Sequence, residues 1–196
     1  MQAQQPEPTS ADVLERACRS TATILEMVRS ADLDQPTPCA SWNVRDLVNH
    51  VVGGAGRFAE LAEKGAVTDR GDDPDCTAAD FPGTFRREAE RLVAAFRAPG
   101  AMTKPMKLPF GELPGSVCVW IAAGDIFTHG WDLAKATGQP TDLEPDVAAR
   151  LLAQLKPMLP DEMRGPDGEA AFGPRVEIAD SAPAADRLAA FEGRHP

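Results

Sequence analysis

The chain has 196 residues, 43% of them hydrophobic, so it is long enough for one domain with a sizeable core and a small appendage. Its 30 acidic and 20 basic residues give a formal net charge of -10, which argues against a surface that binds the phosphates of nucleic acid. The N-terminal stretch lacks the pattern of a signal peptide, and no apolar run approaches the about 20 residues that span a bilayer. We therefore expect a soluble, cytoplasmic protein without nucleic-acid or membrane partners.

The N-terminal part of the chain predicts a tail and one helix. Residues 1–9 are polar and contain prolines, so we expect a disordered tail. A first helix is expected from Ser10 to about Ser30, with Val13, Ile24, Leu25 and Val28 among its apolar positions. The segment "DQPTPCAS" then breaks the helix, because its prolines favour extended geometry.

A second helix is expected over "SWNVRDLVNHVVGGAGRFAELAEKG". Asn43 is a good N-cap, and Asp46 three residues later resembles the carboxylate of a capping box. At about 100° per residue, His50 lies roughly 60° from Leu47 and can point into a cleft beside the core. The apolar stripe that should face the core consists of Val44, Leu47, Val48, Val51, Ala55, Phe58 and Ala62.

Two further long helices follow. The third is expected to enter near Pro82 and to end before "APG", with Phe85, Leu92, Val93 and Phe96 as its apolar residues. The segment "MTKPMKLPFGELPG" reads as a loop with one short extended piece. The fourth helix should begin near Ser116 and stop at Gly138, because Pro140 cannot continue it.

The C-terminal part predicts shorter elements: a fifth helix around Val147 to Leu155, a short strand at Val176–Ile178 and a terminal helix over Asp186–Phe191. Four long amphipathic segments with little strand signal indicate a mainly all-α fold, an up-down four-helix bundle. We assign the bundle to residues 10–160 and expect residues 161–196 to form an extension that packs on it.

The fourth helix contains an unusual group of ionisable residues in "GDIFTHGWDLAKATG". Asp125 and His129 are four residues apart and Asp132 follows three residues later, so all three lie on one face of the helix. Unpaired charges in a core would cost several kcal/mol, so these groups need water, a counter-charge or a metal. Asp132 could orient His129 or cap a neighbouring backbone group, or it could simply face solvent.

Of the three histidines, His50 and His129 fall on long helices beside apolar stripes, whereas His195 near the chain end should be solvated. His50, Asp125 and His129 together make a two-histidine, one-carboxylate set, and such a set leaves coordination positions open for a substrate. A buried Asp–His hydrogen bond without any metal is the alternative interpretation.

The four cysteines do not indicate a disulfide framework or a zinc site. They are scattered along the chain without any CxxC pair, so we expect reduced thiols. Cys118 lies about 10 Å along the helix from Asp125, which is too far to share a metal with Asp125 and His129.

The motifs "SWNVRDLVNHVVGG" and "AAGDIFTHGWDLAKATGQP" together resemble the DinB-like superfamily, specifically its actinobacterial branch similar to the N-terminal domain of mycothiol-dependent maleylpyruvate isomerase. The resemblance implies a four-helix bundle that holds a divalent metal through His50, Asp125 and His129. It implies zinc first, with nickel, iron or manganese as alternatives. Asp125 stands where the isomerase-like sequences carry a glutamate, and the isomerase has a substantial C-terminal domain.

The resemblance implies a metal-dependent thiol transferase or isomerase-like enzyme that activates a low-molecular-weight thiol such as mycothiol for attack on an electrophile. Two other functions stay open: a hydrolase that uses a metal-bound water, and a non-catalytic module whose metal only stabilises the bundle. The resemblance is also compatible with a homodimer. Neither the substrate nor the native metal follows from the residues.

Overall fold

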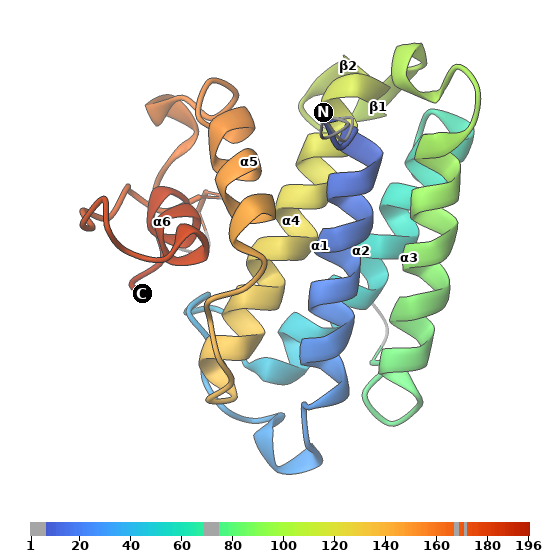
Figure 1. The fold of residues 1–196 in the computed structure, drawn as a ribbon. Helices are drawn as coiled ribbons and strands as arrows, with labels where there is room; N and C mark the ends of the chain where they lie inside the picture. Colours follow the sequence, from blue (N-terminus) through green and yellow to red (C-terminus); the bar gives the residue numbers. More distant parts are fainter. Residues whose placement is uncertain (1–6, 69–74, 167–168, 171) are drawn as a thin grey trace, which may run out of the picture.

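The structure, a computed structural model, describes residues 7–68, 75–166, 169–170 and 172–196. Its four long helices are α1 (Ser10–Glu26), α2 (Val44–Lys64), α3 (Phe81–Arg97) and α4 (Gly115–Ala136). They pack side by side so that α1 contacts α3 and α4, and α2 contacts the same two helices (Figure 1). The predicted up-down four-helix bundle is therefore confirmed. The expected tail over residues 1–9 lies mostly outside the described residues.

Local capping signals position the first two helices. Thr9 and Asp12 form a capping box at the start of α1, and Asn43 and Asp46 form the predicted one at the start of α2. The helix α1 ends at Glu26, earlier than expected, and a short 3-10 turn, η1 (Ser30–Asp32), follows it. The predicted apolar stripe of α2 is buried, except that Phe58 is only partly buried.

Helix α4 lies at the centre of the molecule, in contact with α1, α2 and the two C-terminal helices α5 (Pro145–Leu155) and α6 (Ala184–Phe191). Its contact with α1 requires Gly130, because a Cβ there would lie 2.3 Å from the Thr21 Oγ1 atom. Thr21 also donates a hydrogen bond of 2.9 Å from that oxygen to the carbonyl of Ile126. The close packing holds the segment that carries Asp125, His129 and Asp132 rigidly against its neighbour.

The sheet of the described residues is a hairpin of two antiparallel strands, β1 (Pro105–Leu108) and β2 (Gly111–Pro114), in the segment expected to be mainly loop. It is preceded by a 3-10 turn, η2 (Ala101–Thr103). The predicted strand at Val176–Ile178 is wrong. Its residues belong to no strand, because no other strand lies beside them, and the Val176 amide instead donates to the carbonyl of Ala190 in α6.

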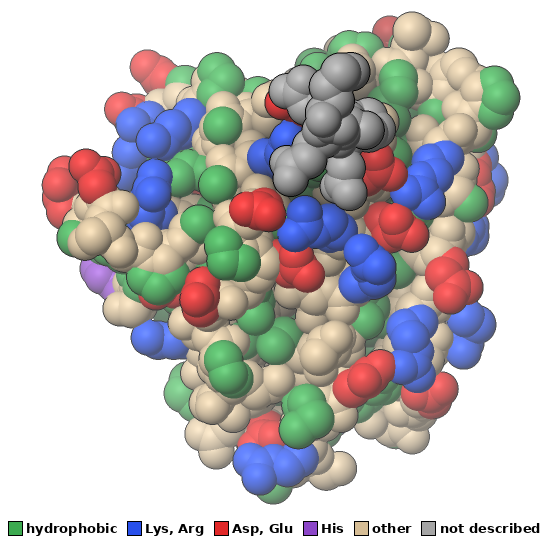
Figure 2. All heavy atoms as spheres, in the orientation of Figure 1, with side chains coloured by type: hydrophobic (Ala, Val, Ile, Leu, Met, Phe, Trp, Pro, Cys, Tyr) green, Lys and Arg blue, Asp and Glu red, His purple; other side chains and the backbone are tan. Residues whose placement is uncertain are grey.

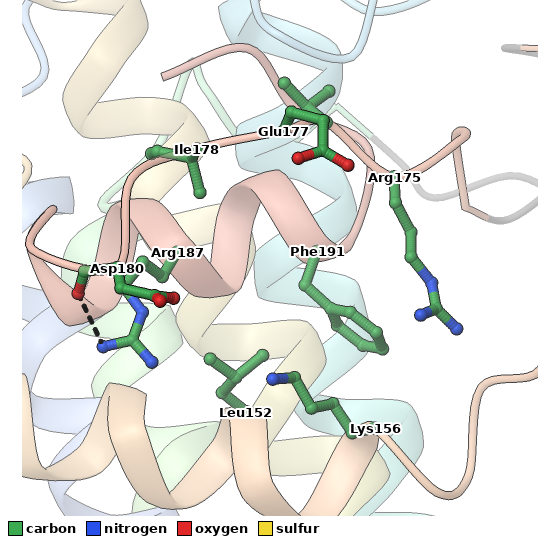
Figure 3. A pocket seen from close by; sticks show the side chains of 9 residues that line it. Leu152, Lys156, Arg175, Glu177, Ile178, Asp180, Arg187 and Phe191 are labelled. Atoms are coloured by element: carbon green, nitrogen blue, oxygen red, sulfur yellow. Dashed lines mark hydrogen bonds between the residues drawn. The ribbon is translucent and has the colours of Figure 1, made fainter.

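The C-terminal residues lie along the side of the bundle formed by α4 and α5, where a third 3-10 turn, η3 (Asp161–Met163), and the helix α6 occur (Figure 1). A pocket of about 230 Å³ opens between α5 and the segment around α6, lined by Leu152, Lys156, Arg187 and Phe191 among others (Figure 3). None of the predicted metal-site residues lines this pocket. In the part of the chain that the structure describes, no helix is long and apolar enough to cross a membrane.

The surface carries charges of both signs. Figure 2 shows acidic and basic side chains interspersed over the face of α1 and its neighbours, without one large patch of a single sign. Ion pairs account for part of this pattern: Arg97 contacts Asp12 and Glu15, and Arg86 contacts Glu26. The charge of -10 is therefore not gathered into one field on this face.

Candidate metal centre

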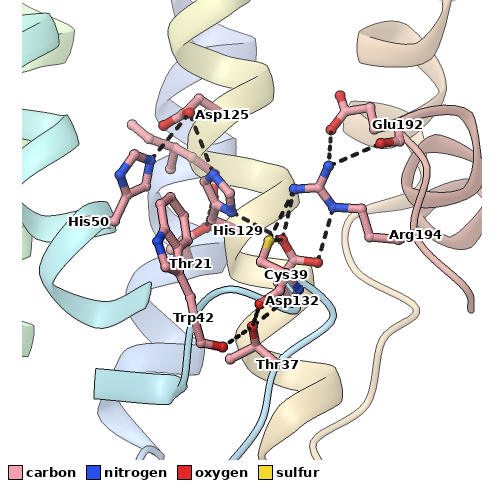
Figure 4. A network of polar contacts seen from close by, with 11 residues as sticks. Thr21, Thr37, Cys39, Trp42, His50, Asp125, His129, Asp132, Glu192 and Arg194 are labelled. Atoms are coloured by element: carbon pink, nitrogen blue, oxygen red, sulfur yellow. Dashed lines mark hydrogen bonds and ion pairs between the residues drawn. The ribbon is translucent and has the colours of Figure 1, made fainter. Parts of the chain in front are cut away.

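The structure brings His50, Asp125 and His129 together between α2 and α4, as the sequence predicted (Figure 4). The Asp125 Oδ1 atom lies 3.7 Å from the Nε2 atom of His50 and 3.6 Å from the Nε2 atom of His129. One atom from each residue falls within 4.8 Å of the other two. The aspartate, although shorter than the glutamate of the isomerase-like sequences, therefore reaches both imidazoles.

These distances fit an ion between the three side chains better than direct hydrogen bonds. A separation of 3.6–3.7 Å exceeds the usual N–H···O range. Two ligands about 2.1 Å from one tetrahedral zinc ion lie about 3.4 Å apart, which is close to the spacing observed. Two imidazole nitrogens and one carboxylate oxygen are also a donor set that zinc and related divalent metals accept.

The site is open on one side. The side chains of His50 and Asp125 are each 26% exposed and that of His129 is 11% exposed, so a small molecule can reach the point where the three converge. Among the residues that the structure describes, no fourth histidine, cysteine or carboxylate joins this group. That arrangement matches catalytic metal sites, which keep a position free, rather than closed structural ones.

The carboxyl group of Asp125 is ionised more readily than an ordinary aspartic acid. The surrounding protein disfavours its charged form, but the imidazoles of His50 and His129 more than offset this, so that the pKa of Asp125 lies below its usual value. The guanidinium of Arg57 acts in the same direction. The site thus presents a carboxylate, the form that binds a cation.

Trp42, which was not among the predicted site residues, forms one wall of the site. Its ring centroid lies 4.5 Å from that of His50 and 5.8 Å from that of His129. The two imidazole rings are edge to face at 4.9 Å. Because Trp42 directly precedes the N-cap of α2, the start of that helix places the indole against both rings. Its position in the "SWNVRD" motif was the available signal.

Asp132 lies behind His129, on the side away from His50 (Figure 4). Its side chain is fully buried, so the solvent-facing alternative for this residue is wrong. The Oδ2 atom lies 3.0 Å from the Nδ1 atom of His129. Burial alone would raise the pKa of Asp132, but the Arg194 guanidinium and the His129 imidazole hold that pKa below its usual value. The carboxylate therefore accepts a hydrogen bond from Nδ1–H, and Nε2 is the ring nitrogen that faces Asp125.

Arg194, close to the C-terminus, completes this arrangement and was missed from the sequence. Its Nη2 atom lies 3.1 Å from Asp132 Oδ2, and its Nε atom lies 3.3 Å from Asp132 Oδ1. The same Nη2 atom lies 3.5 Å from the Cys39 sulfur. His195, the next residue, is exposed as predicted. The short tail "EGRHP" offered no periodicity from which a buried arginine could be inferred.

Cys39 is a hydrogen-bonding thiol in this cluster. Burial and the neighbouring carboxylate of Asp132 raise the pKa of Cys39 to about 12. Its S–H group donates to Asp132 Oδ2 over 3.4 Å. Cys39, His129 and Asp132 form a second group of suitable metal ligands, but the Arg194 guanidinium already supplies a cation there. All four cysteines are free thiols, as expected.

Glu192 lies beside Arg194 and is also buried. Burial is the largest influence on it and raises the pKa of Glu192 to about 7. The carboxylates of Asp132 and Asp125 act in the same direction, whereas Arg194 and Thr128 oppose it. Two buried acids thus flank Arg194, and their pKa values are shifted in opposite directions. The pKa of Asp132 is lowered, whereas that of Glu192 is raised.

Comparisons with known proteins show what the chain is similar to. The profile of the mycothiol maleylpyruvate isomerase N-terminal domain family matches residues 14–134, which include all of the site except Arg194 and Glu192. Relatives from two strains of Mycobacterium tuberculosis, each described as an uncharacterized protein, are 39% identical over 180 residues. Those alignments cover 92% of this chain and 94% of each relative.

Solved structures of the isomerase share the fold. The crystal structure of the mycothiol-dependent maleylpyruvate isomerase superposes with a TM-score of 0.57 at 16% identity. The crystal structure of a histidine-to-alanine mutant of that enzyme superposes with a TM-score of 0.58 at 19% identity. Both superpositions cover 74% of this chain and 66% of the isomerase chain, so the similarity spans just under two thirds of the enzyme.

Proposed function

The chain belongs to the mycothiol maleylpyruvate isomerase N-terminal domain family, and from this premise we propose that it is a metal-dependent enzyme that uses a low-molecular-weight thiol, mycothiol, as its co-substrate. The reaction class is transfer of the thiol to an electrophilic substrate, or isomerisation of that substrate through reversible thiol addition. His50, Asp125 and His129 are the proposed metal ligands.

The observation that carries the proposal is the convergence of two imidazole nitrogens and one carboxylate oxygen on a point with an open side. A purely structural metal would be enclosed by a fourth protein ligand. The described residues supply three, and the exposed flank of His50 and Asp125 leaves room for a thiol.

A divalent cation held there supplies Lewis-acid chemistry that favours the ionised, nucleophilic form of a thiol near neutral pH. The residues of this chain prepare the site for it. Asp125 remains a carboxylate, and Asp132 accepts a hydrogen bond from Nδ1 of His129. The Nε2 atom of that ring is then available as a metal ligand. Trp42 packs against both imidazole rings in tilted arrangements and so helps to hold them in place.

The chain's own thiol near the site does not compete with the co-substrate. Cys39, whose pKa is raised to about 12, stays protonated, and Asp132 together with Arg194 occupies its hydrogen-bonding capacity. In this proposal the added thiol, and not Cys39, is the nucleophile. The donor set suits zinc best, and nickel, iron or manganese are the other metals to test.

The test is thiol-dependent consumption of an electrophile by the metal-loaded protein. We expect zinc-loaded protein to consume maleylpyruvate or a model electrophile only when mycothiol or a small surrogate thiol is added. His50→Ala should abolish this activity, and His195→Ala, which changes an exposed histidine, should not. Turnover of a hydrolysable substrate without any thiol would instead favour a hydrolase that activates water. Absence of thiol-dependent turnover with each of the four metals would overturn the proposal.

A further inference from the structure

A buried cluster made of three distant parts of the chain lies directly behind the candidate metal centre (Figure 4). Cys39 comes from the loop before α2, His129 and Asp132 come from α4, and Arg194 comes from the C-terminal segment after α6. Cys39 and Arg194 are 155 positions apart in the sequence. The cluster therefore exists only if the C-terminal segment is docked on the bundle.

Arg194 contacts more than one polar group from its buried position. Two of its nitrogens lie 3.1 and 3.3 Å from the two oxygens of Asp132, so both oxygens are fixed at once. Its Nη1 atom donates to the backbone carbonyl of Glu192 over 3.1 Å. The side chain is only 10% exposed. A guanidinium bound to both oxygens fixes the plane of a carboxylate, which a point charge cannot do.

The orientation of Asp132 determines the orientation of His129. The carboxylate accepts from Nδ1 over 3.0 Å, on the opposite edge of the ring from the Nε2 atom that faces Asp125. A carboxylate free to rotate would leave the imidazole free to turn as well. Partners of this kind typically change metal affinity by roughly 10–100-fold, because they set the direction of the ligand lone pair.

We infer that Arg194 is a positioning residue of the candidate metal centre, which fixes His129 through Asp132 and thereby makes the C-terminal segment part of the site. The inference rests on the metal-binding role proposed above and extends it to a residue outside the part of the chain matched by the family profile. Among the described residues, Arg194 makes no hydrogen bond or ion pair to His50, Asp125 or His129. Its effect passes through one carboxylate.

The first measurement is the metal affinity of the full-length variants Arg194→Ala and Arg194→Lys, by competition with a chromogenic zinc chelator. We expect Arg194→Ala to weaken zinc binding by about 10-fold, within the range seen for indirect ligand partners. Arg194→Lys should recover part of the loss, since it restores the charge but not the paired hydrogen bonds. The absorption spectrum of the cobalt-substituted protein should also change, because it reports ligand geometry.

Arg164 provides the matched control. It is a second buried guanidinium of the C-terminal region, and it donates to the carbonyls of Gly173 and Phe191 and pairs with Asp161. Among the described residues it makes no hydrogen bond or ion pair to Asp132 or to the three proposed ligands. Arg164→Ala should lower the melting temperature of the protein but leave zinc affinity and the cobalt spectrum unchanged. If Arg164→Ala weakens zinc binding as much as Arg194→Ala does, loss of packing in the whole C-terminal segment explains the effect and the inference fails.

A double-mutant cycle tests the route through Asp132. We expect Asp132→Asn to weaken zinc binding by itself, and Arg194→Ala to add little further loss in that background. Fully additive losses would overturn the inference, because Arg194 would then act independently of Asp132. The wild-type measurement separates the two proposals. If wild-type protein binds no divalent metal, the proposed function fails. If it binds zinc and Arg194→Ala binds equally well, only the role of Arg194 fails.

Discussion

Two sets of charged side chains join elements of this protein, and they differ in their contact with water. On the outer face of the bundle, Arg97 bridges α3 to Asp12 and Glu15 of α1 with side chains that are 41–43% exposed. Behind the candidate metal centre, Arg194 meets Asp132, whose side chain is 0% exposed. The outer set lies in solvent and the inner set is closed off from it.

This difference in exposure implies a difference in the free energy that each set contributes to folding. Exposed pairs contribute little, because water already solvates the charges and the long side chains lose entropy. A buried pair loses the solvation of both ions, and apolar residues of similar size are often at least as stabilising. Asp132 and Arg194 stand next to a candidate ligand, so we attribute their presence to the orientation of His129 rather than to stability.

The largest expected effect concerns the ligands themselves. We expect His50→Ala, Asp125→Ala and His129→Ala each to remove most of the bound metal, because each loss leaves only two protein ligands. Metal content after dialysis, measured by elemental analysis, checks this, with His195→Ala as the control on an exposed histidine. Stoichiometric metal retained in the His50→Ala protein would contradict the three-ligand assignment, since His50 is the one proposed ligand that α2 supplies.

The second-largest effect is expected at the inner pair, Asp132 and Arg194. Asp132→Ala leaves the buried Arg194 guanidinium without its main partner, so we expect the free energy of unfolding to fall by about 3–5 kcal/mol. Urea denaturation at neutral pH measures it. A loss below about 1 kcal/mol would show that the inner pair is no more critical to the fold than a surface pair.

Glu192 should give the inner cluster a distinctive pH dependence. Its pKa rises from 4.5 to about 7 on folding, so the folded protein binds the proton more tightly than the unfolded chain. The stabilisation is complete below pH 4.5 and is lost as the pH rises to about 7. The free energy of unfolding should therefore decline over this window. The decline should be smaller in Glu192→Gln, which cannot ionise.

The comparison with Glu192→Gln isolates this group, because the other ionisable groups are common to both proteins. The charged groups that act on Glu192 are Arg194 on the same segment, Arg164, and Asp125 and Asp132 on α4, where Thr128 also contacts it. Urea denaturation at several pH values from 4.5 to 7 gives the two slopes. Equal slopes in the two proteins would mean that Glu192 titrates as it does in the unfolded chain.

The smallest effect is expected at the outer pair. Arg97→Ala removes contacts of 2.8 and 2.9 Å to Asp12 and Glu15, yet we expect it to lower the free energy of unfolding by no more than about 1 kcal/mol. The loss should shrink further in 1 M salt, where the screening length falls to about 3 Å. Salt-independent destabilisation as large as that of Asp132→Ala would erase the distinction between the two sets.

Local patterns were sufficient to predict the helices and one part of the site. Asn43 and Asp46 marked the start of α2, because capping depends only on residues three positions apart. The spacing of Asp125, His129 and Asp132 placed them on one face of α4, because the geometry of a helix is set by the backbone. His50 was located on the flank of its helix by the same argument.

The remainder depended on contacts between distant segments. A strand was expected at Val176–Ile178, but a strand needs a partner, and the hairpin formed instead over Pro105–Pro114, where two adjacent segments could pair. Cys39, Glu192 and Arg194 had no sequence pattern to mark them, because their roles follow from the docking of a loop and a C-terminal segment, and Trp42 was marked only by its place in the "SWNVRD" motif. The sequence by itself therefore determined the helices and the spacing of the candidate ligands on α4, since these depend on neighbours within a few residues. Only the tertiary structure decided what surrounds His129, since burial and partners are properties of the packed molecule.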